Sequence, residues 1–181
     1  MISKTFDKIK KILPITLLVW PYLCILPFGL GSDNEEFSAV FILLYCGLTL
    51  VVYALNIINA CLYKGEDACY RLAFWNMLIK LVHIPFYLCV FVLGVCLLLA
   101  AVVPALLLVT PIMVFMLFLI DLLLMVTSSL YGVNALIRAA RQGMVSKKFA
   151  VIGSILHFFF VTDVICSIVV YAKLRKGRKK K

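Results

Sequence analysis

The long uncharged stretch Leu72–Ala140 constrains the fold of this chain more than any other feature. Only three of its side chains carry a formal charge at neutral pH: Lys80, Asp121 and Arg138. A soluble domain has no means of hiding so long an apolar run, whereas each membrane-spanning helix takes up about 20 apolar residues. The stretch is therefore predicted to form a hairpin of transmembrane helices.

The composition of the whole chain supports the same class of protein. Hydrophobic residues make up 65% of the chain and its mean hydropathy is +1.14, whereas soluble domains are roughly 45–50% apolar. The 181 residues fit one helical domain, 1–181, without a separate soluble domain. We expect an all-α, multi-pass bundle in the cell membrane.

Five apolar segments are predicted to form the helices of this bundle, at 12–30, 37–63, 72–103, 105–137 and 149–172, with a basic tail at 173–181. The first segment contains Pro14, Pro21 and Pro27, which would kink it, as a membrane helix tolerates. No polar loop separates the third segment from the fourth, so Pro104 and Pro111 mark the expected reversal.

The net charge of +10 is concentrated beside these segments, while Gly31–Glu36 forms an acidic turn. Every Lys and Arg other than Lys80 lies in one of four flanking stretches: 1–11, 64–71, 138–148 and 173–181. Such clusters indicate contact with anionic lipid headgroups rather than with nucleic acid. Five full spans would nevertheless put the basic loop 138–148 and the basic tail on opposite sides, which the positive-inside rule disfavours.

Three alternatives would gather more of this charge on one side. The first segment could only dip into the membrane, the last could be re-entrant, or Leu72–Ala140 could hold three spans. A re-entrant last segment would put all the flanking cations on one side, but Phe149–Ala172 has no proline that would break it. Five helices are favoured, and the orientation is left open.

Polar side chains recur at helical spacing within three segments, and each row occupies one helix face. The rows are Thr49, Tyr53, Asn56 and Asn59, then Asn76, Lys80, His83 and Tyr87, then Thr127, Tyr131, Asn134, Arg138 and Arg141. Polar groups are costly against lipid, so they face protein or water. Antiparallel neighbours would bring the rows together toward one leaflet. The predicted crevice comprises Asn56, Asn59, Asn76, Lys80, His83, Tyr87, Tyr131 and Asn134.

Two interpretations of this crevice compete. In the first, the polar groups bond between helices and fix their packing, at about 0.6 kcal/mol for each bond. In the second, Asn76, Lys80 and His83 line a water-accessible cavity that takes an anionic headgroup or a small solute. Lys80 could also extend toward the headgroups by itself.

Two acids lie within the apolar segments. Asp121 is in the middle of its segment and would be protonated or paired, either as a proton relay or as a buried helix contact. Asp163 is six residues from His157, which on a continuous helix is about 120° away. Each of these two side chains is therefore expected to need a partner on another helix.

No pattern in the chain indicates an enzyme. The HExxH, GxSxG, P-loop and GxGxxG motifs are absent, and the seven cysteines form no CxxC pair. We therefore expect no catalytic residues, no metal site and no cofactor.

The segments NMLIKLVHIPFY and DLLLMVTSSLYGVNALIRAARQG resemble small multi-span membrane proteins of Gram-positive bacteria that have no assigned function. The resemblance implies the bacterial inner membrane and assigns no site residues. The sequence thus favours a non-enzymatic accessory, scaffold or immunity-like protein that contacts lipids and another membrane protein. The alternative is a transport component that binds a solute or headgroup in the crevice.

Overall fold

The computed structural model describes residues 2–25, 35–65 and 67–178, and every regular element in these ranges is a helix. The predicted all-α fold is therefore confirmed. The elements are α1 (Ile2–Val19), the 3-10 helix η1 (Trp20–Ile25), α3 (Glu35–Leu62), α4 (Ala68–Ala100), the 3-10 helix η2 (Pro104–Leu106), α5 (Val109–Arg141), α6 (Lys147–Leu156) and α7 (Phe160–Arg178).

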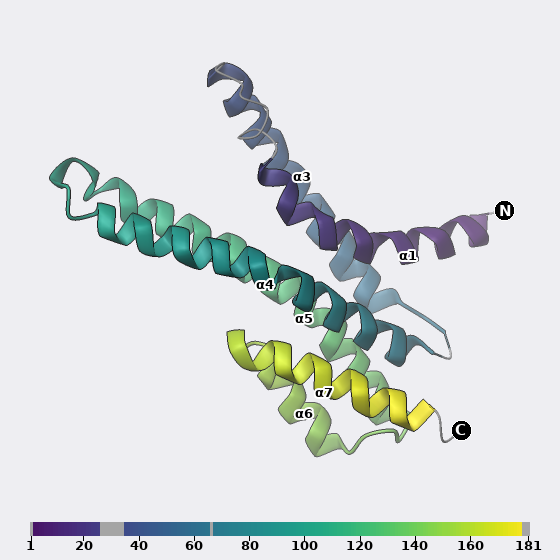
Figure 1. Ribbon diagram of the computed structural model, residues 1–181. Coiled ribbons are helices and arrows are strands. Elements are labelled where there is room, and N and C mark those ends of the chain that lie inside the picture. Colours follow the sequence, from purple (N-terminus) through teal and green to yellow (C-terminus); the bar gives the residue numbers. More distant parts are fainter. Residues whose placement is uncertain (1, 26–34, 66, 179–181) are drawn as a thin grey trace.

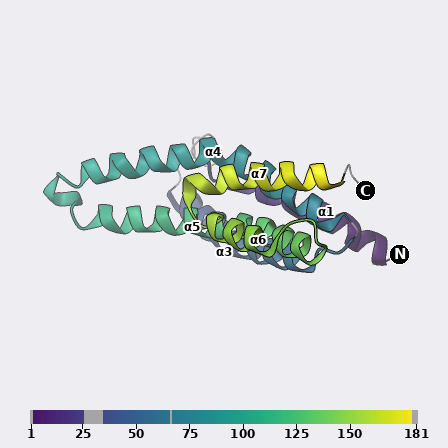
Figure 2. The ribbon, with the colours of Figure 1, turned by 90° about the horizontal axis from the view of Figure 1, so that it is seen from below.

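Three of the described helices, α3, α4 and α5, are long and apolar enough to cross a membrane. They correspond to the predicted segments 37–63, 72–103 and 105–137, and the chain reverses at η2 as Pro104 indicated. Figure 2 shows α4 and α5 side by side, with their connecting turn far from both chain ends. The centre of the fold is thus a long helical hairpin whose two helices are each long and apolar enough to span a membrane.

The end of α5 is set by local chemistry. Gly143 adopts a left-handed conformation with φ of 70°, which glycine reaches without steric cost. The amides of Gly143 and Met144 then donate to the carbonyls of Ala140 and Ala139, at 3.2 and 2.9 Å, which is a Schellman motif. Ser146 accepts from the amide of Phe149 at 3.3 Å and caps α6.

The last predicted segment, 149–172, is not one helix. It breaks at His157–Phe159, and α6 and α7 form a short helical hairpin that packs on α4 and α5 (Figure 1). Two carbonyls at this break accept hydrogen bonds from side chains: Thr162 Oγ1 donates to the Leu156 carbonyl at 3.2 Å, and Ser129 Oγ donates to the His157 carbonyl at 2.7 Å. Irregular backbone at membrane depth requires such partners. The expectation of one continuous helix over 149–172 is therefore wrong, and a helical hairpin is the shape that the re-entrant alternative would require.

The described part of the first predicted segment, 12–25, is also divided, into the end of α1 and η1, while residues 26–30, with Pro27, lie outside the described residues. Pro14 deprives the Lys10 carbonyl of its intrahelical donor, and the Asn59 side chain of α3 donates to that carbonyl instead, at 3.2 Å. At η1, the Trp20 indole donates to Thr49 Oγ1 at 2.7 Å, and its ring stacks on Tyr45 at 5.5 Å. These contacts hold the first segment along α3.

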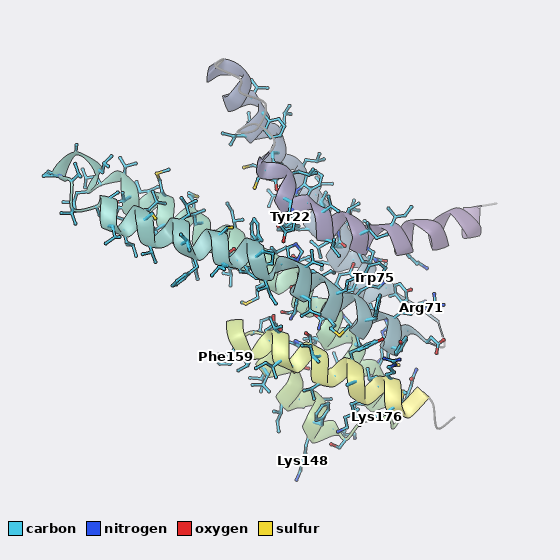
Figure 3. All side chains as sticks on the ribbon, viewed as in Figure 1. Tyr22, Arg71, Trp75, Lys148, Phe159 and Lys176 are labelled. Carbon is cyan, nitrogen blue, oxygen red and sulfur yellow. The ribbon has the colours of Figure 1, made fainter. Side chains whose placement is uncertain are left out.

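The chain ends and two connections lie at the same end of the molecule. The start of α1, the α3–α4 turn, the α5–α6 loop and the end of α7 all lie away from the η2 turn (Figure 1). Figure 3 shows Arg71, Lys148 and Lys176 at this basic end, with Phe159 at the opposite end of the α6–α7 hairpin. Residues 31–34 of the predicted acidic turn and residues 179–181 of the tail lie outside the described residues.

Candidate functional site

Lys80 of α4 and Asp163 of α7 form a buried ion pair at the tip of the α6–α7 hairpin. The lysine side chain is only 1% exposed, so it does not extend to the headgroups. Its ammonium also donates to Ser129 Oγ of α5 at 3.1 Å and lies 3.3 Å from His157 Nδ1. Lys80 thus donates to α5 through Ser129 and to α7 through Asp163, and its charge is neutralised by Asp163.

His157 joins this pair through its Nδ1 atom, which lies 2.7 Å from Asp163 Oδ1. Because a carboxylate only accepts hydrogen bonds, Nδ1 is the protonated nitrogen and donates to Asp163. In a neutral imidazole, Nε2 is then left as an acceptor. Cys166 Sγ lies 4.0 Å from that nitrogen. We call Lys80, Ser129, His157 and Asp163 the charge cluster.

The contact between His157 and Asp163 contradicts the expectation that these two side chains lie apart. A continuous helix would have placed the two side chains about 120° apart. The break between α6 and α7 removes that constraint and brings them together, and Lys80 is the partner that Asp163 needed.

Three helices place the charge cluster at the same depth. Lys80 is nine residues from Arg71, Ser129 is nine from Arg138, and Asp163 is ten from Lys173. At about 1.5 Å per helical residue, each lies about 14–15 Å from the basic end. This is close to half of a hydrocarbon core of about 30 Å, the region where ionisable groups are most costly.

Asn76 lies beside the charge cluster without a hydrogen-bond partner. The residue is 0% exposed, and neither its Oδ1 nor its Nδ2 is bonded within the described chain. Its Nδ2 lies 2.7 Å, and His157 Nε2 lies 2.6 Å, from the point that a Cβ on Gly132 would occupy. Only glycine at 132 therefore allows the amide and the imidazole to approach α5 this closely.

The polar row of α3 is bonded to α5. Tyr131 donates its hydroxyl hydrogen to Asn56 Oδ1 at 2.8 Å and accepts from Asn59 Nδ2 at 3.2 Å. Asn134 donates to the Leu130 carbonyl in its own helix at 2.9 Å. Arg138 donates to the carbonyl of Cys61 at 2.9 Å, at the end of α3. These contacts fix the packing of α3 on α5.

The remaining members of the α4 row face the first segment and α5. His83 Nδ1 lies 2.6 Å from the Ile79 carbonyl, and its ring stacks on Tyr22 of η1 at 5.9 Å. The Tyr22 hydroxyl donates to the Val82 carbonyl, three residues before Pro85 in α4. Tyr87 interacts with Ser128 of α5.

Asp121 lies apart from the charge cluster. It is eight residues from Ser129 along α5, or about 12 Å. One of its carboxylate oxygens, Oδ1, is buried without a hydrogen-bond partner in the described chain. The two intramembrane acids thus have different surroundings, because Asp163 is paired with a lysine and Asp121 is not.

The predicted crevice residues are mainly packed between helices. At the basic end the structure has a cavity of about 280 Å³ around the α3–α4 turn, lined by Tyr63, Lys64, Gly65, Asp67, Ala68 and Arg71. The α4 row is shared among η1, α5 and the α6–α7 hairpin, rather than facing α3 as expected. The contacts between α3 and α5 agree with the first interpretation, in which polar groups bond between helices and fix their packing.

Sequence reasoning missed Ser129, Gly132 and the joint role of His157 and Asp163. One signal was available: a lysine nine residues inside the basic boundary needs an acid at equal depth. Asp163, ten residues from Lys173, meets that condition, whereas Asp121 does not.

The charge cluster has the chemistry of a proton-exchanging or structural network. It contains a donor, a carboxylate and an imidazole in contact, in a site that excludes lipid. Within the described residues, no group of three or more His, Cys, Asp or Glu side chains could hold a metal ion.

Residues 13–176 match a family described as "Family of unknown function (DUF6652)". No curated protein and no solved structure matches the chain.

Proposed function

The chain belongs to the DUF6652 family, to which no function is assigned, and we propose that it is a non-enzymatic accessory or scaffold protein of the cell membrane. An immunity-like factor belongs to the same class, because it too would act by binding another membrane protein. The resemblance to small bacterial proteins supports the inner membrane as the location.

The observation that carries this proposal is how the polar groups are used. Tyr131 of α5 bonds to Asn56 and Asn59 of α3, and Lys80 of α4 is bonded to Asp163 of the α6–α7 hairpin. Groups bonded in this way hold the helices together and are not free to bind a substrate. The protein therefore offers its surroundings mainly an apolar surface.

That apolar surface is longer than a bilayer requires. The helices α4 and α5 each contain 33 residues, or about 50 Å, against a hydrocarbon core of about 30 Å. Near their connecting turn, Leu99 and Leu108 are 67% and 81% exposed. Apolar helix beyond the membrane thickness must tilt or be covered. We infer that a helix of another membrane protein covers it.

The basic end supports a definite orientation. The α3–α4 turn, the α5–α6 loop and the end of α7 lie together, and each carries Lys or Arg. By the positive-inside rule this end faces the cytoplasm, where it meets anionic headgroups.

Photocrosslinking from within the membrane tests the proposed partner. A photoreactive amino acid at Leu99 or at Leu108 should give a discrete adduct with another protein in native membranes. The same amino acid at Leu136, which is 0% exposed, serves as the control and should give none. Adducts with lipid alone from both exposed positions would overturn the proposal.

A transport component remains the second candidate, and Asn76 favours it. This buried amide has no hydrogen-bond partner among the described residues and lies beside the charge cluster, as expected of a group that binds a solute or water. Transport predicts that Asn76→Leu abolishes uptake or ligand-induced stabilisation while the protein still inserts. A scaffold predicts that the same variant keeps its partner crosslinks.

A further inference from the structure

An apolar groove separates α3 and η1 from the central hairpin. Its cavity has a volume of about 440 Å³, and its walls come from η1, α3, α4 and α5. Figure 1 shows α3 diverging from α4 and α5 on the side away from the chain ends. Among the lining residues are Tyr45, Tyr53, Phe86, Leu93, Leu117 and Ile120. A volume of this size and an apolar, aromatic lining are typical of sites for small organic molecules.

The unpaired acid of the membrane interior lies beside this groove. Asp121 follows the lining residue Ile120 and interacts electrostatically with Tyr53, which also lines the groove, and with Tyr87 of α4. Its Oδ1 is buried without a hydrogen-bond partner in the described chain. Lys80, the cation within the apolar part of α4, is already paired with Asp163. Asp121 is not itself a lining residue, so the groove has apolar walls and, at its margin, an acid that no cation of the described helices neutralises.

We propose that this groove binds a lipophilic organic cation, whose apolar body fills the cavity and whose positive charge lies at Asp121. Such a ligand meets both requirements of the site, because it is stable in an apolar environment and supplies the missing counter-charge. The rings of Tyr45, Tyr53 and Phe86 line the same cavity and would attract a cation by their negative faces.

Other occupants satisfy only one of these requirements. A lipid acyl chain would fill the apolar cavity but would leave the Asp121 carboxylate without a partner. A metal ion would need several ligands, and the described residues contain no cluster of His, Cys, Asp or Glu that could hold one. The proposal is independent of the partner proposed for the α4–α5 tip, because the groove residues lie nearer the middle of the hairpin.

Binding of tetraphenylphosphonium to the full chain in phosphatidylcholine nanodiscs tests the site. We expect saturable binding that weakens by roughly tenfold or more in Asp121→Asn. Asp67→Asn, the same change in the α3–α4 turn, is the matched control and should bind as the unmodified protein does. Leu93→Trp, which fills the groove and keeps Asp121, should also weaken binding.

Two results would overturn the proposal. One is the absence of saturable binding to the unmodified protein, and the other is binding that both Asp121→Asn and Leu93→Trp leave unchanged. Thermal unfolding of each variant in the same nanodiscs is measured alongside. If Asp121→Asn fails to fold, Leu93→Trp decides: reduced binding by this folded variant supports the groove, and unchanged binding overturns it.

Discussion

The two halves of the α4–α5 hairpin differ in what surrounds them. Near the basic end, these helices pack against α3 and the α6–α7 hairpin, and Lys80, Ser129 and Tyr131 are all buried. Toward the η2 turn, side chains such as Leu99 and Leu108 are exposed. The same two helices thus serve as a polar, tightly packed core in one half and as an apolar surface in the other. The stability of the fold should depend on the half near the basic end, and binding of another membrane protein should depend on the half near the η2 turn.

The largest effect is expected from breaking the ion pair. Asp163→Ala leaves the Lys80 ammonium buried without a counter-charge, and we expect a loss of about 3–5 kcal/mol in the free energy of unfolding. The measurement is unfolding by denaturing detergent in mixed micelles. The double variant Lys80→Met/Asp163→Leu contains no unpaired charge and should recover most of the loss. Equal stability of the single and double variants would contradict the pairing.

A smaller loss of stability is expected from adding one methyl group to the packed half of the α4–α5 hairpin. In Gly132→Ala, the new Cβ would lie 2.6 Å from His157 Nε2 and 2.7 Å from Asn76 Nδ2, so these groups must move. Overpacking of this kind costs about 1–3 kcal/mol.

Gly94→Ala is the matched control for this change, because its Cβ would meet nothing within 4 Å. It lies in the exposed half of α4 and should be neutral or stabilising by up to about 1 kcal/mol, since alanine favours the helix. If the two glycine variants unfolded at the same detergent fraction, the contrast between the two halves would be wrong.

The smallest effect is expected from Tyr131→Phe. This change removes the hydroxyl that bonds Asn56 and Asn59 and leaves the ring in place. We expect a loss of about 1 kcal/mol, measured by the same unfolding assay. Tyr70→Phe, which removes one hydroxyl bond near the surface to Tyr171, should cost less. A larger loss from Tyr70→Phe than from Tyr131→Phe would reverse the assignment of the packed core.

Much of the fold could be predicted because its cause is local. The apolar lengths of α3, α4 and α5, and the reversal at Pro104, follow from composition and from proline chemistry within a few residues. The spacing of Asn76, Lys80 and His83 also put them correctly on one helix face. What that face contacts depends on other helices, so sequence periodicity could not supply it.

The hairpin of α6 and α7 could not be predicted from local signals. No proline interrupts Phe149–Ala172, and the break is stabilised by distant groups, Ser129 on α5 and Lys80 on α4. The distribution of charge was the one sequence feature that favoured a hairpin here, because only a re-entrant last segment would put all the flanking cations on one side.

The most direct test of this account is the sidedness of the two basic stretches that flank the α6–α7 hairpin. Lys147 and Lys176 are both exposed and can be replaced by cysteine, one at a time, in a background without native cysteines. A membrane-impermeant maleimide should label both positions in inverted membrane vesicles and neither in intact cells. If one position reacts from outside intact cells and the other only in inverted vesicles, the last segment crosses the membrane and the ion-paired, re-entrant hairpin is wrong.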